Sequence, residues 1–469
     1  MDLKKLDAII DSYRDEIISD IQKWVAIPSV LGEPAENAPF GTEGRRMMDL
    51  AIQTARGYGL ETRDLDGYCA DVTLCEGEQT MGMLCHLDVV PAGDGWTKDP
   101  WGGEIADGRI YGRGTMDDKG PALAALHAMR AVREAGIPMK DGVRLILGGD
   151  EETGMTDMRY YRSKLPMPDY GFSPDAEFPV INIEKGGLGL ELSRYTGSEE
   201  GAEIPVYEMF AGIRANVVPG IATAKLGYAD YAALEKRMAA VAAERGFALS
   251  LKDLGDGVAE LAAEGKSAHA STPELGKNAA GILLIALSDM GAGGGSKPAI
   301  AALAEKLGVE YDGKALGIKI SDEESGALTC NLGLLRFDGK FVSAVLDIRY
   351  PISADEQKLC GQAAMALSGT GLSLMRRGGH TPHHVPKEHK VVRGLIKVYS
   401  EVTGTPGYAF AIGGGTYSRC MPNTVAFGFN FPGDVDTCHM PDEYVDIEKL
   451  MLSVKIFAHA IVELAGAEG

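Results

Sequence analysis

Five short segments of the sequence carry histidines and carboxylates of the kinds that bind metal ions. They are HLD at residues 86–88, MDD at 116–118, GGDEETG at 148–154, SPDAE at 173–177 and DTCHMPDE at 436–443. Taken together, these segments offer two imidazoles and three carboxylates: His86, Asp117, Glu152, Asp175 and His439. Such a set suits two borderline divalent ions such as zinc, manganese or cobalt. Two adjacent ions need a bridging ligand, which a carboxylate supplies.

Each segment also has a structural alternative. His86 alone is more often a core histidine, and Asp118 is equally well explained as the N-cap of a helix that starts at Lys119. The acidic run 150–152 would be a solvated loop, except that it directly follows the apolar run 143–148, which reads as a buried strand. Three adjacent acids in a desolvated cleft repel one another unless cations neutralise them.

The elements around these residues predict an α/β sheet. The apolar run 81–90 reads as a buried strand that ends near His86 and Asp88, whose side chains leave the strand on the same side. The carboxyl ends of strands are where open α/β sheets bind ligands. Helical periodicity is predicted over 6–24, 43–57, 119–135 and 450–465, and the buried-strand pattern returns at 425–431.

The sequence pattern changes after residue 186. Strands there alternate apolar and polar residues more regularly, and helices are predicted over 228–245, 274–290 and 297–307. The proline-broken segment 380–389 reads as a crossover linker. We therefore predict a discontinuous catalytic domain, residues 1–186 and 385–469, interrupted by an inserted α+β domain, residues 187–384, which is large enough for two lobes.

Composition limits the partners. The 469 residues include 46 lysines and arginines against 67 aspartates and glutamates, a net charge of −21. Such a chain repels phosphate backbones, so nucleic acid and anionic membranes are poor partners. Seven scattered cysteines without a CxxC pair indicate reduced thiols. With no signal peptide and no apolar run of about 18 residues, the expected location is the cytoplasm.

Several motifs resemble a known enzyme family. HLDVVPAGDGW, YGRGTMDDKGP, GGDEETG, SPDAEFPVINIEKG and the late HMPDE resemble the co-catalytic di-metal peptidases that include carboxypeptidase G, carnosinase and the aminoacylases. The resemblance runs from Trp24 to the C-terminus. Within that superfamily the PDAEFPVINIEKG, AGIRANVVP and FAIGGGTYSR segments look most like the bacterial dipeptidase V (PepV) group. The resemblance implies a zinc-exopeptidase-like catalytic domain with an inserted lid.

The resemblance also implies roles for individual residues. His86 and His439 would each bind one metal ion, Asp117 would bridge the two, and Glu152 and Asp175 would complete the ligand shells. Zinc is the expected metal, with manganese and cobalt as alternatives. Glu151 would be the general base that activates water. Asp88 would orient the His86 imidazole, and the peptide bond between Asp117 and Asp118 would be cis.

Substrate contacts are implied mainly in the insertion. His269 would stabilise the oxyanion, and Asn216 and Arg349 would hold the carbonyl and the terminal carboxylate of the substrate, with help from Gly414, Gly415 and Thr416. The histidines at 380, 383, 384 and 389 lie in the predicted linker, so we expect no metal there. His127, within a predicted helix, is expected to be structural.

The expected activity is hydrolysis of dipeptides with a free N-terminus. Two alternatives stay open at this stage: an N-acyl amino acid deacylase with the same metal site, and an inactive metal-binding or sensor protein. Because the insertion has room for a second lobe in the position that a partner's lid occupies in dimeric relatives, we predict a functional monomer.

Overall fold

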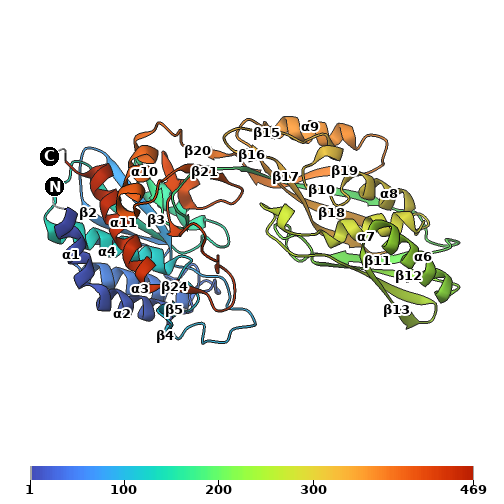
Figure 1. Ribbon diagram of the computed structural model, residues 1–469, viewed down its shortest axis with the longest axis horizontal. Helices are drawn as coiled ribbons and strands as arrows, with labels where there is room; N and C mark the ends of the chain where they lie inside the picture. The colour runs from blue at the N-terminus through green and yellow to red at the C-terminus, as the bar shows by residue number, and fades with distance from the viewer. Residues whose placement is uncertain (1–2, 468–469) are drawn as a thin grey trace. The chain divides into compact units, whose positions relative to one another are not determined.

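The computed structural model describes residues 3–467 and divides into two compact units (Figure 1). Unit 1 comprises residues 1–183, 384–410 and 415–469, and unit 2 comprises residues 184–383 and 411–414. Within residues 3–467, no helix combines the length and apolarity that a membrane crossing requires.

Unit 1 is built on a mixed sheet with the strand order β1-β2-β6-β3-β7-β22-β9-β20, and β21 pairs with β9. The central strands β6, β3, β7 and β22 run parallel, and β1, β2 and β9 are antiparallel to their neighbours. The sheet strands are β1 (Glu61–Leu65), β2 (Cys69–Cys75), β3 (Thr80–His86), β6 (Gly142–Gly148), β7 (Tyr170–Ser173), β9 (Val180–Glu184), β20 (His383–His384), β21 (Ala409–Ile412) and β22 (Thr424–Ala426).

Helices pack on this sheet, which confirms the predicted α/β class. They are α1 (Leu3–Ser12), α2 (Arg14–Val25), α3 (Thr42–Gly57), α4 (Lys119–Ala135), α5 (Thr156–Lys164), α10 (Lys390–Thr403), α11 (Ile447–Ala465) and the short η3 (Tyr417–Cys420). Short ribbons add β4 (Glu104–Ala106), β5 (Arg109–Tyr111), β8 (Ala176–Glu177), β23 (Phe429–Asn430) and β24 (Tyr444–Asp446). The first and last helices, α1 and α11, lie side by side and are joined by ion pairs from His459 to Asp7 and from Lys455 to Asp11.

Unit 2 is an antiparallel sheet with the order β13-β14-β12-β11-β17-β18-β10-β19. Its strands are β10 (Gly186–Tyr195), β11 (Val206–Ala211), β12 (Ile221–Gly227), β13 (Ala248–Gly255), β14 (Val258–Glu264), β17 (Thr329–Phe337), β18 (Phe341–Tyr350) and β19 (Ser373–His380), with a small hairpin of β15 (Ser321–Asp322) and β16 (Gly326–Ala327). The helices are α6 (Tyr231–Arg245), α7 (Ala279–Asp289), α8 (Lys297–Lys306), α9 (Glu356–Ala366) and the short turns η1 (Pro273–Leu275) and η2 (Lys314–Leu316).

Several predicted elements are shorter than the sequence pattern suggested. The opening helix breaks at Tyr13, and the strand predicted over 81–90 ends at His86. The strand predicted over 425–431 breaks at Gly428, where φ is +93° and a Cβ would lie 2.6 Å from the Phe178 ring. The helix predicted from residue 274 begins only at Ala279, because Asn278 caps it by accepting from the N–H groups of Ala280 and Gly281.

Candidate metal centre

Parallel strands of unit 1 deliver the candidate metal ligands to one edge of the sheet. His86 is the last residue of β3, the GGDEETG segment directly follows β6, and Asp175 lies two residues beyond β7. Because β3, β6 and β7 are parallel neighbours, their carboxyl ends meet at the same edge. Asp117 comes from the loop before α4, and His439 from the loop before β24.

Asp117 lies between the two candidate histidines. Its Oδ1 is 3.0 Å from Nε2 of His86, and its Oδ2 is 2.9 Å from Nε2 of His439. One carboxylate thus faces two imidazoles through its two separate oxygens, as a ligand shared between two ions would. The peptide bond from Asp117 to Asp118 is cis, as the resemblance implied.

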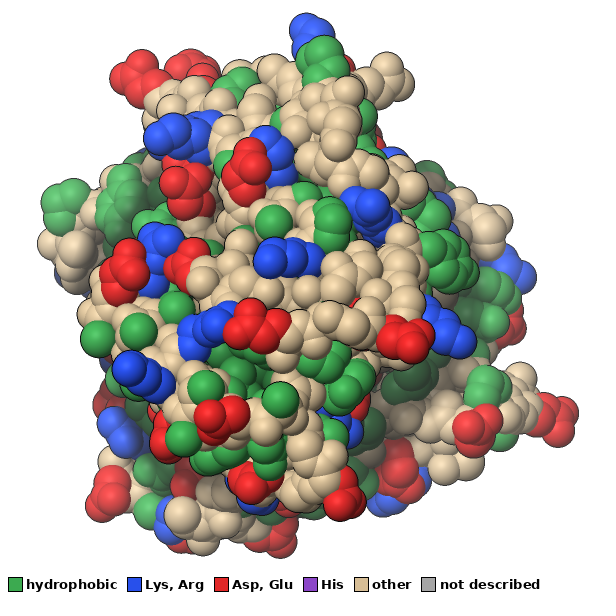
Figure 2. Space-filling model, turned by 90° about the vertical axis from the view of Figure 1, so that its right-hand side faces the viewer, with side chains coloured by type: hydrophobic (Ala, Val, Ile, Leu, Met, Phe, Trp, Pro, Cys, Tyr) green, Lys and Arg blue, Asp and Glu red, His purple; other side chains and the backbone are tan. Residues whose placement is uncertain are grey.

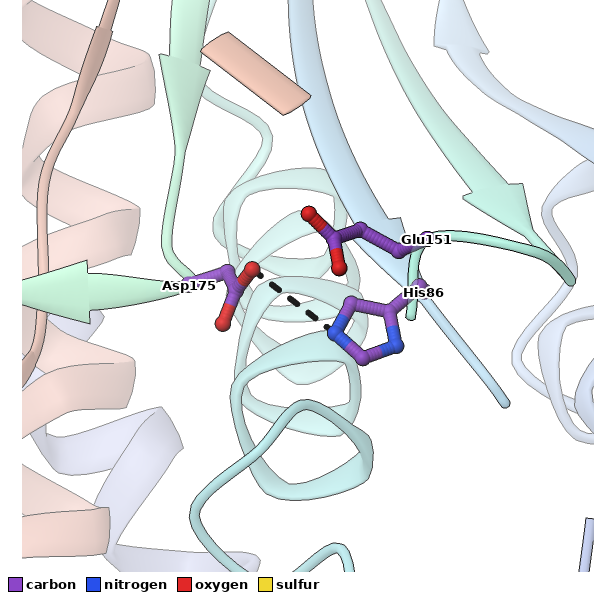
Figure 3. Close-up of side chains that lie close together, drawn as sticks. All are labelled: His86, Glu151 and Asp175. Atoms are coloured by element: carbon purple, nitrogen blue, oxygen red, sulfur yellow. Dashed lines mark ion pairs between the residues drawn. The ribbon is translucent and has the colours of Figure 1, made fainter. Parts of the chain in front are cut away.

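The two remaining carboxylates extend this arrangement on either side. Oε1 of Glu152 is 2.9 Å from Nε2 of His439, and Oδ2 of Asp175 is 3.7 Å from Nε2 of His86. Figure 3 shows the side chains of His86, Glu151 and Asp175 pointing toward one another from β3 and the loops that follow β6 and β7. Ligand atoms of His86, Glu151 and Asp175, and of His86, Asp117 and Glu152, form two groups compact enough for a metal ion.

Asp88 connects the histidine to the acidic loop. Its backbone oxygen is 2.9 Å and its Oδ1 is 3.3 Å from Nδ1 of His86. The same carboxylate accepts hydrogen bonds from the backbone N–H groups of Glu151 and Glu152, at 3.2 and 3.1 Å. Asp88 therefore fixes the His86 ring and the backbone of both glutamates at once, which leaves Nε2 of His86 facing the carboxylates.

Asp118 does not cap α4, so the N-cap alternative is wrong. Its side chain makes no capping hydrogen bond, and its Oδ2 instead accepts from the backbone N–H of His86 at 2.8 Å. Asp118 is fully buried and thus braces the end of β3 rather than the start of α4.

The closely spaced acids and imidazoles shift one another's pKa values. Burial and the neighbouring Asp117 and Asp118 raise the pKa of Asp175 well above its usual value, and burial with the nearby carboxylates raises the pKa of Glu151 to about 8. Hydrogen bonds to Asp117 and Glu152 raise the pKa of His439 to about 10. Burial opposes ionisation of Asp117, but its bonds to His439 and His86 lower its pKa overall.

This donor set fits divalent cations. Nε2 of His86 is buried and makes no well-aligned hydrogen bond, although Asp117 and Asp175 lie close by. Mixed imidazole and carboxylate donors are those that zinc, manganese and cobalt accept. A cation would replace the protons that otherwise relieve the repulsion among these acids.

Unit 2 brings two of the predicted substrate residues together. Val217 and His269 form an isolated antiparallel bridge, and the N–H of Ala270 donates to the backbone oxygen of Asn216 at 2.9 Å. Asn216 is half-buried and His269 is exposed, with its Nδ1 2.7 Å from Oγ of Ser271. Thr272 is the N-cap residue of η1, and the chain beyond it forms only a single 3-10 turn over residues 273–275.

The predicted carboxylate-binding residues are already engaged. Arg349 bonds Asp347 through Nε and Nη2, at 2.6 and 2.9 Å, and its Nη1 donates to the backbone oxygen of Gly413 at 3.1 Å. Gly414 belongs to unit 2, whereas Gly415 and Thr416 belong to unit 1. The Thr416 hydroxyl caps η3 by accepting from the N–H of Ser418. The side chain of Arg349 is thereby fixed beside the glycine segment that starts at residue 413.

Sequence reasoning missed three buried residues that hold these segments in place. Asp157 accepts from the N–H groups of Gly149 and Asp150, at 2.7 and 2.9 Å, and so shapes the loop that carries Glu151. Asn331 donates to the backbone oxygens of Ala215 and Val217, on either side of Asn216. The third residue, Glu443, lies behind Asp117. Asp157 and Glu443 carry carboxylates like the candidate ligands, but these accept backbone N–H groups, and no sequence signal distinguishes that role from metal binding.

The other histidines lie in structural positions. His380 ends β19, His383 and His384 form β20, and His389 is the N-cap residue of α10. Within residues 3–467, neither compact group of metal-binding side chains includes any of them. His127 is buried in α4, with Nε2 3.4 Å from Oδ2 of Asp20.

Comparison with known protein families gives one match over most of the chain. Residues 82–463 match the model described as peptidase family M20/M25/M40. A putative dipeptidase of Bacillus subtilis, YtjP, is 36% identical over 461 residues, covering 96% of this chain and 98% of the relative. A Beta-Ala-Xaa dipeptidase of Lactobacillus delbrueckii is 35% identical over 466 residues, covering 98% of both chains.

Solved structures share the fold at low sequence identity. Human carnosine dipeptidase 1 matches with a TM-score of 0.55 and 17% identity, covering 99% of both chains. Aminoacylhistidine dipeptidase from Vibrio alginolyticus matches with a TM-score of 0.57 and 15% identity, covering 96% of both chains.

Proposed function

The chain belongs to peptidase family M20/M25/M40 and is a peptide-bond hydrolase, and on this premise we propose that it is a two-metal dipeptidase acting on dipeptides with a free N-terminus. The observation that carries this proposal is Asp117, whose two oxygens face the imidazoles of His86 and His439. The names of the two curated relatives, both dipeptidases over nearly full length, support the dipeptide substrate.

Five residues would hold the ions. We assign His86, Asp117 and Asp175 to one ion and His439, Asp117 and Glu152 to the other, an assignment that does not use Glu151 as a ligand. We propose zinc as the metal, with manganese and cobalt as alternatives. When bound, such ions lower the pKa of water toward about 7 and polarise the scissile carbonyl.

Glu151 is the proposed general base. Its carboxylate lies beside His86 and Asp175, and its backbone is fixed by Asp88. From there Glu151 takes a proton from the attacking water and returns it to the leaving amine, a contribution of about 10²–10⁴ in rate. Glu152 lies instead against His439, at 2.9 Å, so the proposed roles of base and ligand fall to two neighbouring glutamates.

Unit 2 is the proposed source of the substrate contacts. We assign residues 187–384 to a lid domain and residues 1–186 and 385–469 to the catalytic domain. His269 and Asn216, which lie on adjacent segments, are the proposed donors to the oxyanion and the substrate carbonyl. Arg349, with Gly414, Gly415 and Thr416, is the proposed site for the terminal carboxylate, since a guanidinium binds carboxylates through paired N–H groups.

A substrate panel tests the activity. Purified protein, stripped of metal and supplied with zinc, manganese or cobalt, is assayed on dipeptides, tripeptides and N-acetyl amino acids. The proposal expects turnover of dipeptides with a free N-terminus and at least tenfold lower kcat/KM for the other two classes. Preferential turnover of N-acetyl amino acids would make the protein a deacylase. Stoichiometric metal binding with no turnover would make it a metal-binding protein.

The protein is also proposed to act as a monomer in the cytoplasm. The support for a monomer is that the large sheet of unit 2 is continuous, with β11 and β17 joined at its centre, so that a second lobe extends the first. All seven cysteines are free thiols, as a reducing compartment favours.

Mixing two inactive variants tests whether active sites are shared. Glu151→Ala lacks the base and His269→Ala lacks the oxyanion donor. If each chain forms its own complete active site, no site in the mixture has both residues, and the mixture stays inactive. The control is each variant alone at twice the concentration. Recovery of activity approaching a quarter of the wild-type value or more would show that the residues come from different subunits and would refute the monomer.

A further inference from the structure

A buried ion pair lies directly behind Asp117 and takes no part in the chemistry proposed above. Glu443 and Arg113 are 0% and 1% exposed, and Nη1 of Arg113 is 2.5 Å from Oε2 of Glu443. Burying two charges costs several kcal/mol per ion before their attraction is counted, so the pair calls for a functional explanation.

The other carboxylate oxygen of Glu443 accepts hydrogen bonds from the backbone segment that leads to Asp117. Oε1 accepts from the N–H groups of Gly114, Met116 and Asp117, at 3.0, 2.9 and 3.3 Å. Gly114 has φ of +91°, and a Cβ there would lie 3.0 Å from side-chain atoms of Lys119 and Val89. One carboxylate oxygen therefore organises a tight loop whose last residue is the candidate bridging ligand.

Glu443 is also fixed to the segment that carries His439. It lies four residues after His439 and directly before β24, which pairs with β5. Its backbone oxygen accepts from the N–H of Gly112 at 2.9 Å. The side chain thus joins the Asp117 loop to the His439 loop at the point where these two ligands must stand 2.9 Å apart.

Arg113 completes the link. Besides neutralising Glu443, its Nη2 donates to the backbone oxygen of Ala92 at 3.2 Å, and its guanidinium lies 5.3 Å from the ring centre of Trp96. Ala92 and Trp96 belong to the loop that follows His86 and Asp88. The loops that carry Asp117 and His439 and the loop that follows His86 therefore meet at one buried pair.

We propose that Glu443, held by Arg113, is a positioning residue that sets the separation of Asp117 and His439 and thereby the affinity of the ion they share. The inference rests on the proposed function only in taking these two residues as ligands. Residues that orient metal ligands from behind typically contribute 10- to 100-fold in metal affinity.

Two matched double variants separate the hydrogen-bond acceptor from the charge. R113Q/E443Q is neutral and keeps a side-chain oxygen for the three N–H groups, whereas R113M/E443M is neutral and has none. The single variant Asp442→Asn is the control, because Asp442 bonds Thr97 and Lys98 on the outer side of the same loop. Isothermal titration of metal-stripped protein with Zn²⁺ gives the affinity and the number of ions bound, and thermal melting of the metal-free forms reports the fold.

The inference expects R113M/E443M to bind its weaker ion at least tenfold less tightly than R113Q/E443Q, with D442N within twofold of wild type. Saturating Zn²⁺ should restore most of the kcat of R113M/E443M. Equal affinities in the two double variants would overturn the inference while leaving the proposed function standing. A wild-type protein that bound no Zn²⁺ would overturn both.

If R113M/E443M does not fold, hydrogen exchange on the metal-free wild-type protein tests the role of Glu443 instead. The inference expects slow exchange of the amides of Gly114, Met116 and Asp117, because Glu443 accepts from all three. Exchange at the rate of exposed loops would overturn it.

Discussion

The two units differ in what they bury. Unit 1 buries ionisable groups throughout, among them Asp20, His86, Asp88, Arg113, Asp118, Lys119, His127, Asp157 and Glu443. Unit 2 buries mainly apolar side chains and small polar ones, with Glu184 and Glu191 as its buried carboxylates. Figure 2 shows one face of the molecule, over which acidic and basic side chains are interspersed.

The difference indicates a division of labour. In unit 1 buried partners fix His86 and the backbone of Asp117 and Glu152, so this geometry exists before any substrate arrives. In unit 2 the residues Asn216 and His269 are held through their backbone while their side chains stay accessible. Changes in unit 1 should therefore alter metal binding, and changes in unit 2 should alter substrate contacts and turnover while metal binding stays unchanged.

Metal removal should give the largest effect. Dialysis against a chelator is expected to abolish dipeptide hydrolysis, and zinc, manganese or cobalt should restore it. Metal at 100 times its dissociation constant should stabilise the fold by about 2.7 kcal/mol. Because Trp24, Trp96 and Trp101 all lie in unit 1, tryptophan fluorescence during urea unfolding should report this gain. Full activity after chelation would refute the two-metal assignment.

Removing the base should give the next largest effect. Glu151→Ala is expected to lower kcat by about 10²–10⁴ because proton transfer is lost. Zinc stoichiometry should stay at two, since the proposed ligand set does not include Glu151. Glu78→Ala, which removes an exposed acid of unit 1, is the control and should keep wild-type kcat. Loss of an ion in Glu151→Ala would make Glu151 a ligand instead.

A change in unit 2 should act on the substrate only. Arg349→Lys keeps the charge but loses the paired N–H groups, so kcat/KM for dipeptides is expected to fall about 10- to 100-fold, as for loss of a hydrogen bond to a charged group. Arg377→Lys, an exposed arginine of the same sheet paired with Glu191, is the control. Zinc affinity should not change in either variant. Weaker zinc binding in Arg349→Lys would contradict the expectation that changes in unit 2 leave metal binding unchanged.

The fold was predictable where periodicity was strong and unbroken. The helix over 119–135 matches α4 residue for residue, and the strand over 143–148 matches β6 to within one residue. The errors arise where tertiary contacts end an element. The helical pattern continues across Tyr13 although the helix does not, and at Gly428 the Phe178 ring occupies the space a side chain would need.

The candidate ligands could be named from the sequence because metal binding demands particular side chains at strand ends. The residues that hold them could not, because their role depends on contacts between distant segments. Glu443 stands 326 residues from Asp117, and Asn331 stands 114 residues from Val217. The sequence left the N-cap alternative for Asp118 open for the same reason, since the partner of Asp118 is the backbone of His86 rather than its own helix.

The smallest expected effect tests whether buried charge in unit 1 stabilises the fold away from the metal centre. Burial alone would raise the pKa of Asp20, but the nearby His127 imidazole and hydrogen bonds from Tyr58 and Lys23 lower it to about 2. A carboxyl whose pKa is lowered by folding adds stability above its unfolded pKa of 3.8 and loses it as the pH falls toward 2. Asp20→Asn should therefore cost about 1–2 kcal/mol at pH 7 and about half as much at pH 3.

A matched variant in unit 2 shows whether the change in stability is specific to the buried carboxylate of unit 1. Urea unfolding of metal-free protein, followed by tryptophan fluorescence, reports unit 1 and includes Trp24, one helical turn from Asp20 on α2. Asp253→Asn removes an exposed carboxylate of unit 2 that accepts from Tyr228 and Gly255, and it should leave this transition unchanged at every pH. A cost of Asp20→Asn that is the same at pH 7 and pH 3 would show that Asp20 acts through packing, and the buried charges of unit 1 would then matter only where metal binds.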